Sequence, residues 1–318
     1  MSQDKFLIIG AAGQIGTVLT QTLRKTHGYN KVIATDIRDG EPGDACFEKL
    51  DVLDIARMAE IVNKHRITQI YHLAAILSAK GEAAPLRTWE INMKGLFNVL
   101  EVAREMNVAK VFFPSSIAVF GEGAPKDNTP QDAVLKPTTV YGISKVAGEL
   151  WGQYYWERYG LDVRSLRYPG VIGHQSEPGG GTTDYAVEIF HKAMSGQPFV
   201  CFLKPDTCLP MIYMDDAIRA TLMLMDAPAE KLRVRTSYNV AGMSFTLAEI
   251  AASIQKRIPT FKVSYEPDFR QAIAESWPHS IDDSEARRDW GWEPAYDLEK
   301  MTGDMIAHLQ MRYAIQNC

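Results

Sequence analysis

The first half of the chain alternates short apolar runs with segments whose apolar residues recur at helical spacing. Runs rich in β-branched and aromatic residues predict strands at residues 5–9, 31–35, 69–73, 110–114 and 162–167. Helical spacing lies between these runs, at residues 15–25, 55–65, 92–106 and 141–159. This alternation predicts an α/β fold, a Rossmann-type doubly wound parallel sheet with helices on both faces.

The pattern changes after Pro169, where Gly and Pro become frequent in the segments PGVIG, EPGGGTTD and GQP. Helical spacing returns at residues 185–194, 215–225 and 246–256. We therefore predict a domain at residues 1–170 and a smaller lobe at 171–318, which is interleaved with late strands of the sheet.

Composition narrows the class of protein. The 318 residues include 34 Lys and Arg against 39 Asp and Glu, a net charge of −5 that argues against a nucleic-acid partner. The chain has no apolar run of about 18 residues, and its first residues, MSQDKFLIIG, lack a targeting pattern, so no membrane association is expected. Four cysteines without a CxxC pair are typical of reduced thiols, and we expect a cytoplasmic protein.

A glycine-rich turn follows the first predicted strand. Gly10, Gly13 and Gly16 have the spacing G-x-x-G-x-x-G and open the next helix, whose N-terminus offers free N–H groups to a diphosphate. Asp36 ends the next predicted strand, where a carboxylate would accept hydrogen bonds from ribose hydroxyls and repel a 2′-phosphate. The pattern predicts a dinucleotide site that favours NAD over NADP, although the nearby Arg38 could accept a phosphate. Residues 1–170 are therefore predicted to be an NAD-binding domain, and the lobe at 171–318 to be substrate-binding.

Tyr141 and Lys145 are spaced i and i+4, on one face of a predicted helix. A phenol with a pKa near 10 is a poor base at neutral pH, and a neighbouring ammonium favours its phenolate. Ser116 follows a strand at the carboxyl edge of the sheet, where its hydroxyl could orient a substrate oxygen. We predict that Tyr141 is a general base, that Ser116 orients the substrate, and that Lys145 lowers the Tyr141 pKa and binds a ribose. Ser115 is the alternative to Ser116.

These motifs resemble those of the extended short-chain dehydrogenase/reductase family. The resemblance implies NAD as cofactor, oxidation of a secondary alcohol, and a homodimer formed by the helices at 92–106 and 141–159. His72 is expected to be a packed strand-end histidine rather than a catalyst. The resemblance implies cofactor contacts, beyond the glycines, Asp36, Tyr141 and Lys145, from Gln14, Ile15, Asp51, Val52, Leu73, Ala74, Ala75, Asn92, Tyr168 and Val171.

The run PGGGTTDYA and the later ESWP resemble the members of that family that oxidise L-threonine at its β-carbon to 2-amino-3-oxobutanoate. Backbone N–H groups and threonine hydroxyls suit a carboxylate, and an Asp suits an ammonium, so an amino acid is the expected small-molecule substrate. The alternative for residues 182–184 is a structural role, in which they cap the start of a helix. The alternative for Trp277 is that it packs in the core of the lobe. The residues implied for substrate binding are Ser78, Ser116, Tyr141, Gly181, Thr182, Thr183, Asp184 and Trp277.

Two other functions fit parts of the pattern. A nucleotide-sugar epimerase or dehydratase shares the glycine, Ser, Tyr and Lys motifs, but usually needs a lobe with more basic residues than segment 173–204 offers. A catalytically silent NAD-binding redox sensor would not need Ser116, Tyr141 and Lys145 together. No metal is expected, because the histidines, among them His174, show no ligand spacing with carboxylates along the chain.

Overall fold

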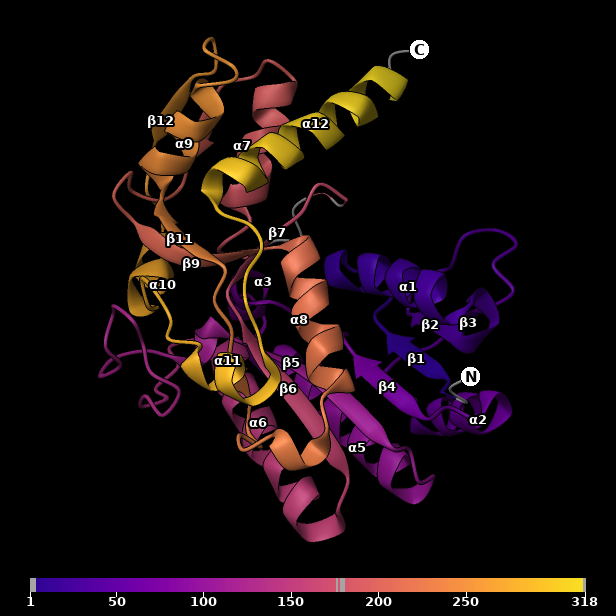
Figure 1. Ribbon diagram of the computed structural model, residues 1–318. Helices are drawn as coiled ribbons and strands as arrows, with labels where there is room; N and C mark the ends of the chain where they lie inside the picture. The colour runs from indigo at the N-terminus through magenta and orange to yellow at the C-terminus, as the bar shows by residue number, and fades with distance from the viewer. Residues whose placement is uncertain (1–3, 176, 178–180, 317–318) are drawn as a thin grey trace.

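The computed structural model of the chain describes residues 4–175, 177 and 181–316. Its largest sheet is parallel, with the strand order β10-β6-β5-β4-β1-β2-β3 (Figure 1). The order of the strands reverses between β1 and β4, and ligands bind at such a point in doubly wound sheets. The strands are β1 (Phe6–Ile9), β2 (Val32–Asp36), β3 (Phe47–Lys49), β4 (Gln69–His72), β5 (Lys110–Ser116), β6 (Asp162–Tyr168) and β10 (Tyr238–Asn239).

Helices cover both faces of this sheet because its strands are apolar on both sides. In β1, Phe6 and Ile8 pack into one core and Leu7 and Ile9 into the other. The Rossmann-type fold predicted from the sequence is therefore confirmed. One face is covered by α1 (Gln14–His27) and α8 (Met214–Asp226), the other by α2 (Ile55–His65), α5 (Gly95–Glu105) and α6 (Val140–Tyr159) (Figure 1).

The structure departs from the predicted elements in two places. The short strand β3, with the sequence FEK, carries too little apolar signal to be predicted. The predicted helix at 92–106 begins instead as a π-helical turn, Glu90–Lys94, before α5. Such turns accommodate a residue that α-helical geometry would point elsewhere. Here Asn92 reaches back to the backbone of Ile76.

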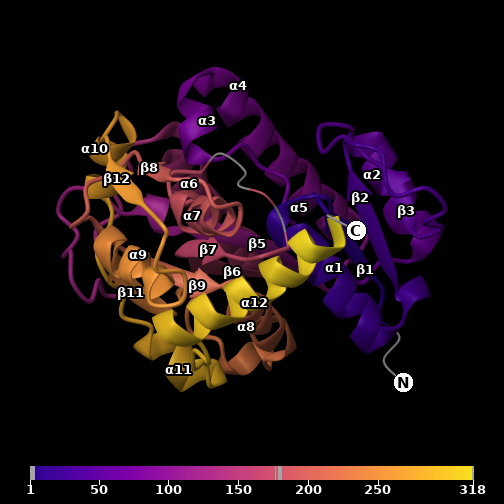
Figure 2. The same ribbon diagram turned by 90° about the horizontal axis from the view of Figure 1, so that it is seen from above.

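The later part of the chain forms a lobe with a core of its own, in which Phe190, Phe245, Ile250 and Met305 are buried together. The helix α12 crosses this lobe and contacts α7 and α9 (Figure 2). Because α8 and β10 return to the large sheet, the division into 1–170 and 171–318 stays a prediction. The lobe contains β7 (Gly170–Ile172), α7 (Tyr185–Met194), β8 (Phe199–Cys201), β9 (Cys208–Tyr213), β11 (Met243–Thr246), α9 (Leu247–Gln255), β12 (Val263–Tyr265), α10 (Arg270–Ser276) and α12 (Leu298–Gln316). The helix α11 (Ser284–Trp290) packs instead beside β10, in the core of the large sheet.

Two short helices, α3 (Ser78–Glu82) and α4 (Pro85–Trp89), connect β4 to the π-helical turn. They contact α6, and α3 stands beside the segment that follows β4. Within the described residues, none of the helices combines the length and the apolar character that a membrane crossing requires.

Candidate active site

A cavity of about 680 Å³ opens beyond the carboxyl ends of the central strands. Its walls come from the turn after β1, the segment after β4, the end of β5, the start of α6, the β6–β7 junction and the segment before α7. Clefts of roughly 300–1,000 Å³ are typical of small-molecule sites. The cavity therefore lies where the reversal of strand order predicts a ligand site, and its size is sufficient for one.

Most of the residues predicted for the site line this single cavity. The exceptions, which are not among its described lining residues, are Asp36, Asp51, Val52, Ala74 and Asn92. Residues from both halves of the chain thus meet at one place, although the roles assigned to them stay predictions. The predicted residues in the lining are Gly10, Gly13, Gln14, Ile15, Gly16, Leu73, Ala75, Ser78, Ser116, Tyr141, Lys145, Tyr168, Val171, Gly181, Thr182, Thr183, Asp184 and Trp277.

The glycine turn has no room for side chains. Gly10 has a φ of +88°, and a Cβ there would lie 2.7 Å from the backbone nitrogen of Ala74. A Cβ at Gly16 would lie 2.2 Å from the carbonyl oxygen of Gly10. Gly13 caps α1 without a side-chain hydrogen bond, and the first residues of that helix line the cavity. The turn fits a diphosphate group bound at the N-terminus of a helix.

Asp36 lies at the end of β2, next to this turn. Its Oδ2 accepts a hydrogen bond from the backbone N–H of Ala12 at 3.0 Å, and Arg38 lies 3.0 Å from Oδ1. Burial raises the Asp36 pKa, but the hydrogen bonds from Arg38 and Ala12 outweigh it and lower the pKa overall. The group is therefore a carboxylate at neutral pH, which fits recognition of a ribose diol. Arg38 is 62% exposed and lines the cavity.

Three of the residues outside the lining have structural contacts. The Asn92 side-chain amide makes two hydrogen bonds to the backbone of Ile76, and this pairing holds the segment after β4 in place. Asp51 is exposed and accepts a hydrogen bond from the backbone of Leu53. Val52 is buried, and its carbonyl accepts from Asn98. These contacts shape the border of the cavity.

Ser116, Tyr141 and Lys145 meet at the cavity wall. The Ser116 hydroxyl acts on the Tyr141 phenol and favours its phenolate form, and its oxygen accepts a hydrogen bond from the backbone N–H of Ala118 at 3.2 Å. Lys145 donates from Nζ to the carbonyl oxygen of Pro114 at 2.7 Å. The same Nζ lies 5.3 Å from the centroid of the Tyr141 ring. The i, i+4 spacing thus brings the two side chains together, as predicted.

Burial changes the electrostatics that we expected for this pair. It raises the pKa of Tyr141 to about 12, although the hydrogen bond from Ser116 acts in the opposite direction. It also lowers the pKa of Lys145 to about 7, against the opposing charge of Glu149. The expected lowering of the Tyr141 pKa by Lys145 is not seen in the protein alone, because the ammonium is itself destabilised by loss of water.

A buried network behind the site distinguishes Ser115 from Ser116. The Ser115 hydroxyl donates to Oε1 of Glu149 at 2.5 Å, so its proton is not available to orient a substrate oxygen. Arg167 donates to both carboxylate oxygens of Glu149, the shortest contact being 2.8 Å. Sequence reasoning missed this network. Its only sequence signal is the position of Glu149, four residues after Lys145 on the same helix.

The opposite wall carries the residues predicted for substrate binding. The hydroxyls of Ser78 and Thr182 lie 3.3 Å apart, and both residues are buried. Asp184 is the N-cap residue of α7 but makes no side-chain cap bond; its Oδ2 accepts from the backbone N–H of Gly181 at 2.8 Å. Trp277 packs into the core of the lobe and lines the cavity, and its buried Nε1 has no hydrogen-bond partner among the described residues.

Two charged residues in the lining were not predicted. Lys80 comes from α3, and its charge in the segment SAKGE is the only signal that could have found it. Glu177 accepts from Gln14 through its carbonyl oxygen at 3.3 Å, and its carboxylate pairs with Arg312 at 3.1 Å. Glu177 thus links the glycine turn to α12. His72 is packed, as expected: burial lowers its pKa to about 3, so it is neutral.

The expectation that no histidine–carboxylate cluster forms is wrong for His174. The fold brings this residue to Asp304 and His308 of α12, and a ligand atom of each lies within 4.8 Å of the others. The cluster was missed because the two segments are far apart in the sequence.

Comparison with known proteins shows the family to which the chain belongs. The sequence model of the NAD dependent epimerase/dehydratase family matches residues 6–241, and the chain belongs to this family. Its glycine turn, Asp36 and the Ser116, Tyr141 and Lys145 group are consistent with that class.

Close relatives share a more specific description. The mitochondrial L-threonine 3-dehydrogenase of Bos taurus is 49% identical over 310 residues, which cover 96% of this chain and 82% of that protein. The solved structure of the L-threonine dehydrogenase of Cupriavidus necator in its holo form is 56% identical, covers 96% of this chain and 99% of its own, and has a TM-score of 0.94. A monomeric L-threonine 3-dehydrogenase from a metagenome is 48% identical, with coverage of 96% and 99% and a TM-score of 0.94.

Proposed function

We propose that this chain is an NAD-dependent L-threonine 3-dehydrogenase, which oxidises the β-hydroxyl of L-threonine to give 2-amino-3-oxobutanoate. The observation that carries the proposal is that one cavity is lined by the glycine turn, by Ser116, Tyr141 and Lys145, and by the hydroxyls and carboxylate of residues 181–184. The three relatives described above, at 48–56% identity and each named as a threonine dehydrogenase, support the same substrate.

The residues have separate roles in this reaction. When bound, NAD supplies the hydride acceptor and, in its oxidised form, a positive charge. Ser116 holds the substrate oxygen beside the Tyr141 phenol, and the phenolate form of Tyr141 accepts the hydroxyl proton as the β-carbon loses its hydride and becomes a carbonyl. Burial keeps Tyr141 protonated in the protein alone, so its function as a base needs further positive charge close by. Lys145, with a pKa of about 7, is suited to exchange that proton with solvent near neutral pH.

The opposite wall suits the two charged ends of an amino acid. Asp184 offers a carboxylate to the ammonium group, and its contact with the backbone N–H of Gly181 orients it. The hydroxyls of Ser78 and Thr182 and the unpaired Nε1–H of Trp277 are donors that a carboxylate can use. Each of these groups is buried or half-buried, so water competes weakly with the substrate.

Charge at the cavity favours threonine over a nucleotide sugar. The cations among the described lining residues are Arg38, Lys80 and Lys145. Arg38 is paired with Asp36 at the ribose end, and Lys145 lies beside Tyr141. Lys80 alone is left to neutralise the diphosphate of a nucleotide sugar, a group that usually needs more than one cation.

The decisive assay is reduction of NAD, followed by nicotinamide absorbance, with L-threonine, with UDP-glucose and with no substrate. We expect reduction with L-threonine alone, and its loss in Tyr141→Phe, while NAD binding by that variant is retained. Absence of reduction with L-threonine at high enzyme concentration would refute the proposal. Conversion of UDP-glucose to an epimer leaves no net reduced NAD, so it is followed by chromatography of the sugar nucleotide, and its detection instead would establish the epimerase alternative.

We also propose a homodimer and a cytoplasmic location, with a role in threonine catabolism. The dimer is supported by large apolar side chains that α6 leaves exposed, namely Leu150, Trp151, Tyr154 and Tyr159. Light scattering should give the mass of two chains, and Leu150→Glu should give one. A wild-type mass of one chain would refute the dimer and match the relative described as monomeric. Three cysteines that form no disulfide support a reducing compartment.

A further inference from the structure

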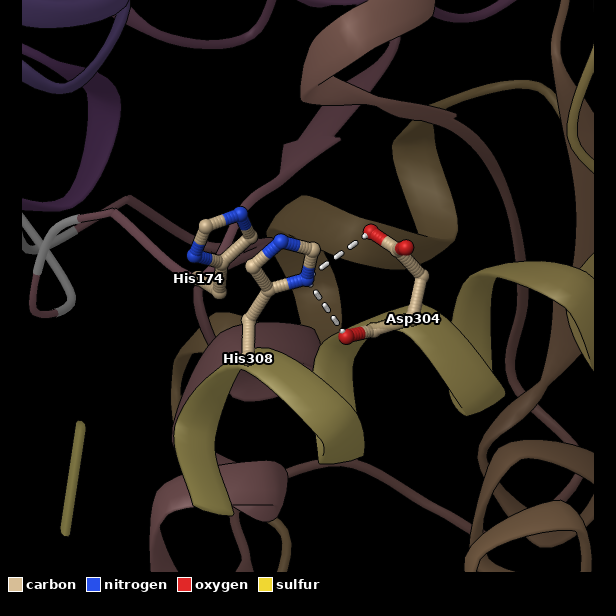
Figure 3. Close-up of side chains that lie close together, drawn as sticks. All are labelled: His174, Asp304 and His308. Atoms are coloured by element: carbon tan, nitrogen blue, oxygen red, sulfur yellow. Dashed lines mark hydrogen bonds and ion pairs between the residues drawn. The ribbon is translucent and has the colours of Figure 1, made fainter. Parts of the chain in front are cut away.

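A cluster of metal-ligating side chains lies outside the cavity, where α12 meets the segment after β7 (Figure 3). His174 comes from that segment, and Asp304 and His308 lie four residues apart on α12, so they share one helix face. We propose that His174, Asp304 and His308 bind a divalent transition-metal ion of the Zn²⁺ class. This proposal does not depend on the proposed function, and its test does not use enzyme activity.

The donor set suits such an ion. Two imidazoles and one carboxylate are ligands that Zn²⁺ and its neighbours prefer, and a fourth position is left for water. Metal–ligand bonds of about 2.0–2.2 Å place the ligand atoms of a tetrahedral site about 3.4 Å from one another. The three ligand atoms here lie within 4.8 Å, so they must move together by about an ångström.

That movement is a rotation of imidazole rings. The rings of His174 and His308 are stacked, with centroids 3.9 Å apart and planes 13° from parallel, so their nitrogen lone pairs do not yet converge. The His308 side chain is 40% exposed and His174 is half-buried, which leaves both rings free space on the solvent side. Nδ1 of His308 already faces Asp304, with its Oδ2 at 3.3 Å, so a turn of the His174 ring and a smaller turn of the His308 ring would let one nitrogen of each face an ion beside the Asp304 carboxylate.

Neighbouring groups already hold two of the ligands in suitable states. Nδ1 of His308 faces two oxygens of Asp304, the backbone carbonyl at 3.0 Å and Oδ2 of the carboxylate at 3.3 Å (Figure 3). A carbonyl can only accept, so Nδ1 carries the proton and Nε2 keeps the lone pair that a metal needs. The Tyr213 hydroxyl donates to Oδ2 of Asp304 at 2.5 Å. Hydrogen bonds of this kind orient ligands in known metal sites.

The surrounding charges also favour a cation. Asp215, in the first turn of α8, acts on His174 in addition to Asp304. The opposing charge is Arg312, whose guanidinium is paired with Glu177 at 3.1 Å. Among the described residues, two carboxylates thus act on His174 and one arginine, itself paired with Glu177, opposes them, so a divalent ion would enter a site beside negative charge.

A bound ion would join α12 to the edge of the cavity. His174 lies three residues before Glu177, whose carbonyl accepts a hydrogen bond from Gln14 in the glycine turn. Fixing His174 to α12 would therefore restrict the segment that borders the dinucleotide site. We expect metal binding to raise the melting temperature of the protein, because an ion that binds only the folded state stabilises it.

The test is titration of the chelator-treated protein with Zn²⁺ by calorimetry, and with Co²⁺ by visible absorption. We expect one ion per chain with a Kd in the micromolar range or below, and Co²⁺ bands of a four-coordinate site. His174→Ala, His308→Ala and Asp304→Asn should each weaken Zn²⁺ binding at least about tenfold, and Tyr213→Phe should do so about tenfold. His65→Ala, which removes a histidine paired with Glu48 elsewhere, is the matched control and should bind as the wild type does.

Circular dichroism establishes that each variant is folded before its affinity is compared. Equal Zn²⁺ affinity in the wild type and His308→Ala would overturn the proposal, because binding would then come from other groups. A Kd weaker than about 100 μM, or Co²⁺ spectra of six-coordinate water-bound ion, would overturn it as well.

Discussion

The buried pair of Glu149 and Arg167 allows a stringent test of the architecture behind the site. Glu149→Gln keeps the shape of the side chain and removes its charge. Glu149 is 1% exposed and Arg167 is 4% exposed, so the guanidinium loses its carboxylate in a place that water does not reach. Its remaining acceptors are the carbonyl of Gln131 at 2.8 Å and Oδ1 of Asn239 at 3.2 Å, neither of which carries charge.

The expected magnitude follows from that burial. Removing one partner of a buried ion pair costs about 3–5 kcal/mol of unfolding free energy, because the other charge is left uncompensated. For chains of somewhat smaller size, each kcal/mol of lost unfolding free energy lowers the melting temperature by roughly 2–4 °C. The melting temperature of this variant should therefore fall by on the order of 10 °C. The Ser115 hydroxyl, which donates to Oε1 of Glu149 at 2.5 Å, would then bond to an uncharged amide oxygen, and this weaker hydrogen bond adds to the effect.

The assay is thermal unfolding followed by circular dichroism, with Glu299→Gln as the matched control. Glu299 also receives two basic side chains, Lys256 at 2.7 Å and Arg257 at 3.0 Å, but it is 48% exposed. Water replaces lost partners at an exposed site, so the control should lower the melting temperature far less. Equal losses in the two variants would show that burial does not determine the strength of the Glu149 pair and would refute the reasoning.

Three other changes test separate parts of the site. A methyl group at Gly16 would lie 2.2 Å from the carbonyl oxygen of Gly10, so Gly16→Ala should weaken NAD binding, measured by calorimetry, by about tenfold or more. Gly303→Ala, whose methyl meets nothing closer than 3.5 Å, should leave it unchanged. Trp277→Phe removes the unpaired Nε1–H and should raise the KM for L-threonine about tenfold with little change in kcat; an unaltered KM would leave Trp277 as a core residue only. Burial lowers the pKa of Lys145 from 10.5 to about 7, so between these pH values the unfolded state binds the proton and the folded state does not. The free energy of unfolding of the wild type, relative to Lys145→Met, should therefore rise as the pH increases from about 7 to 10.5, and a constant difference in urea unfolding would contradict the shift.

Local sequence pattern is sufficient for features that depend on spacing along the chain. The predicted strand at 162–167 is β6 to within one residue, and the predicted helix at 141–159 is α6 to within one residue. These elements are decided by which faces are apolar, and that information lies within each segment. The glycine turn is similar, because its close contact between Gly10 and Gly16 involves neighbouring residues.

Contacts between segments that are far apart in the sequence could not be predicted from local pattern. Ser115 and Ser116 are adjacent in the sequence, which favours Ser116 but does not exclude Ser115, and only the fold places Glu149 and Arg167 behind Ser115. His174 and His308 meet because α12 returns across the lobe, although no spacing in the chain records their distance. Such pairs depend on how elements pack together, and a single sequence carries no direct measure of it.

For Tyr141 and Lys145, the spacing along the chain predicts the contact between the side chains but not the effect of burial on their pKa values. Their i, i+4 positions correctly predict that the two side chains share a helix face. The spacing does not predict how deeply that face is buried. Once α6 packs on the sheet, loss of water disfavours both charged forms, which raises the pKa of the phenol to about 12 and lowers that of the ammonium to about 7. At neutral pH the protein alone thus holds the tyrosine protonated and the lysine between its two states. A base is needed only when substrate is present, and this arrangement leaves its activation to the charge that arrives with the ligands.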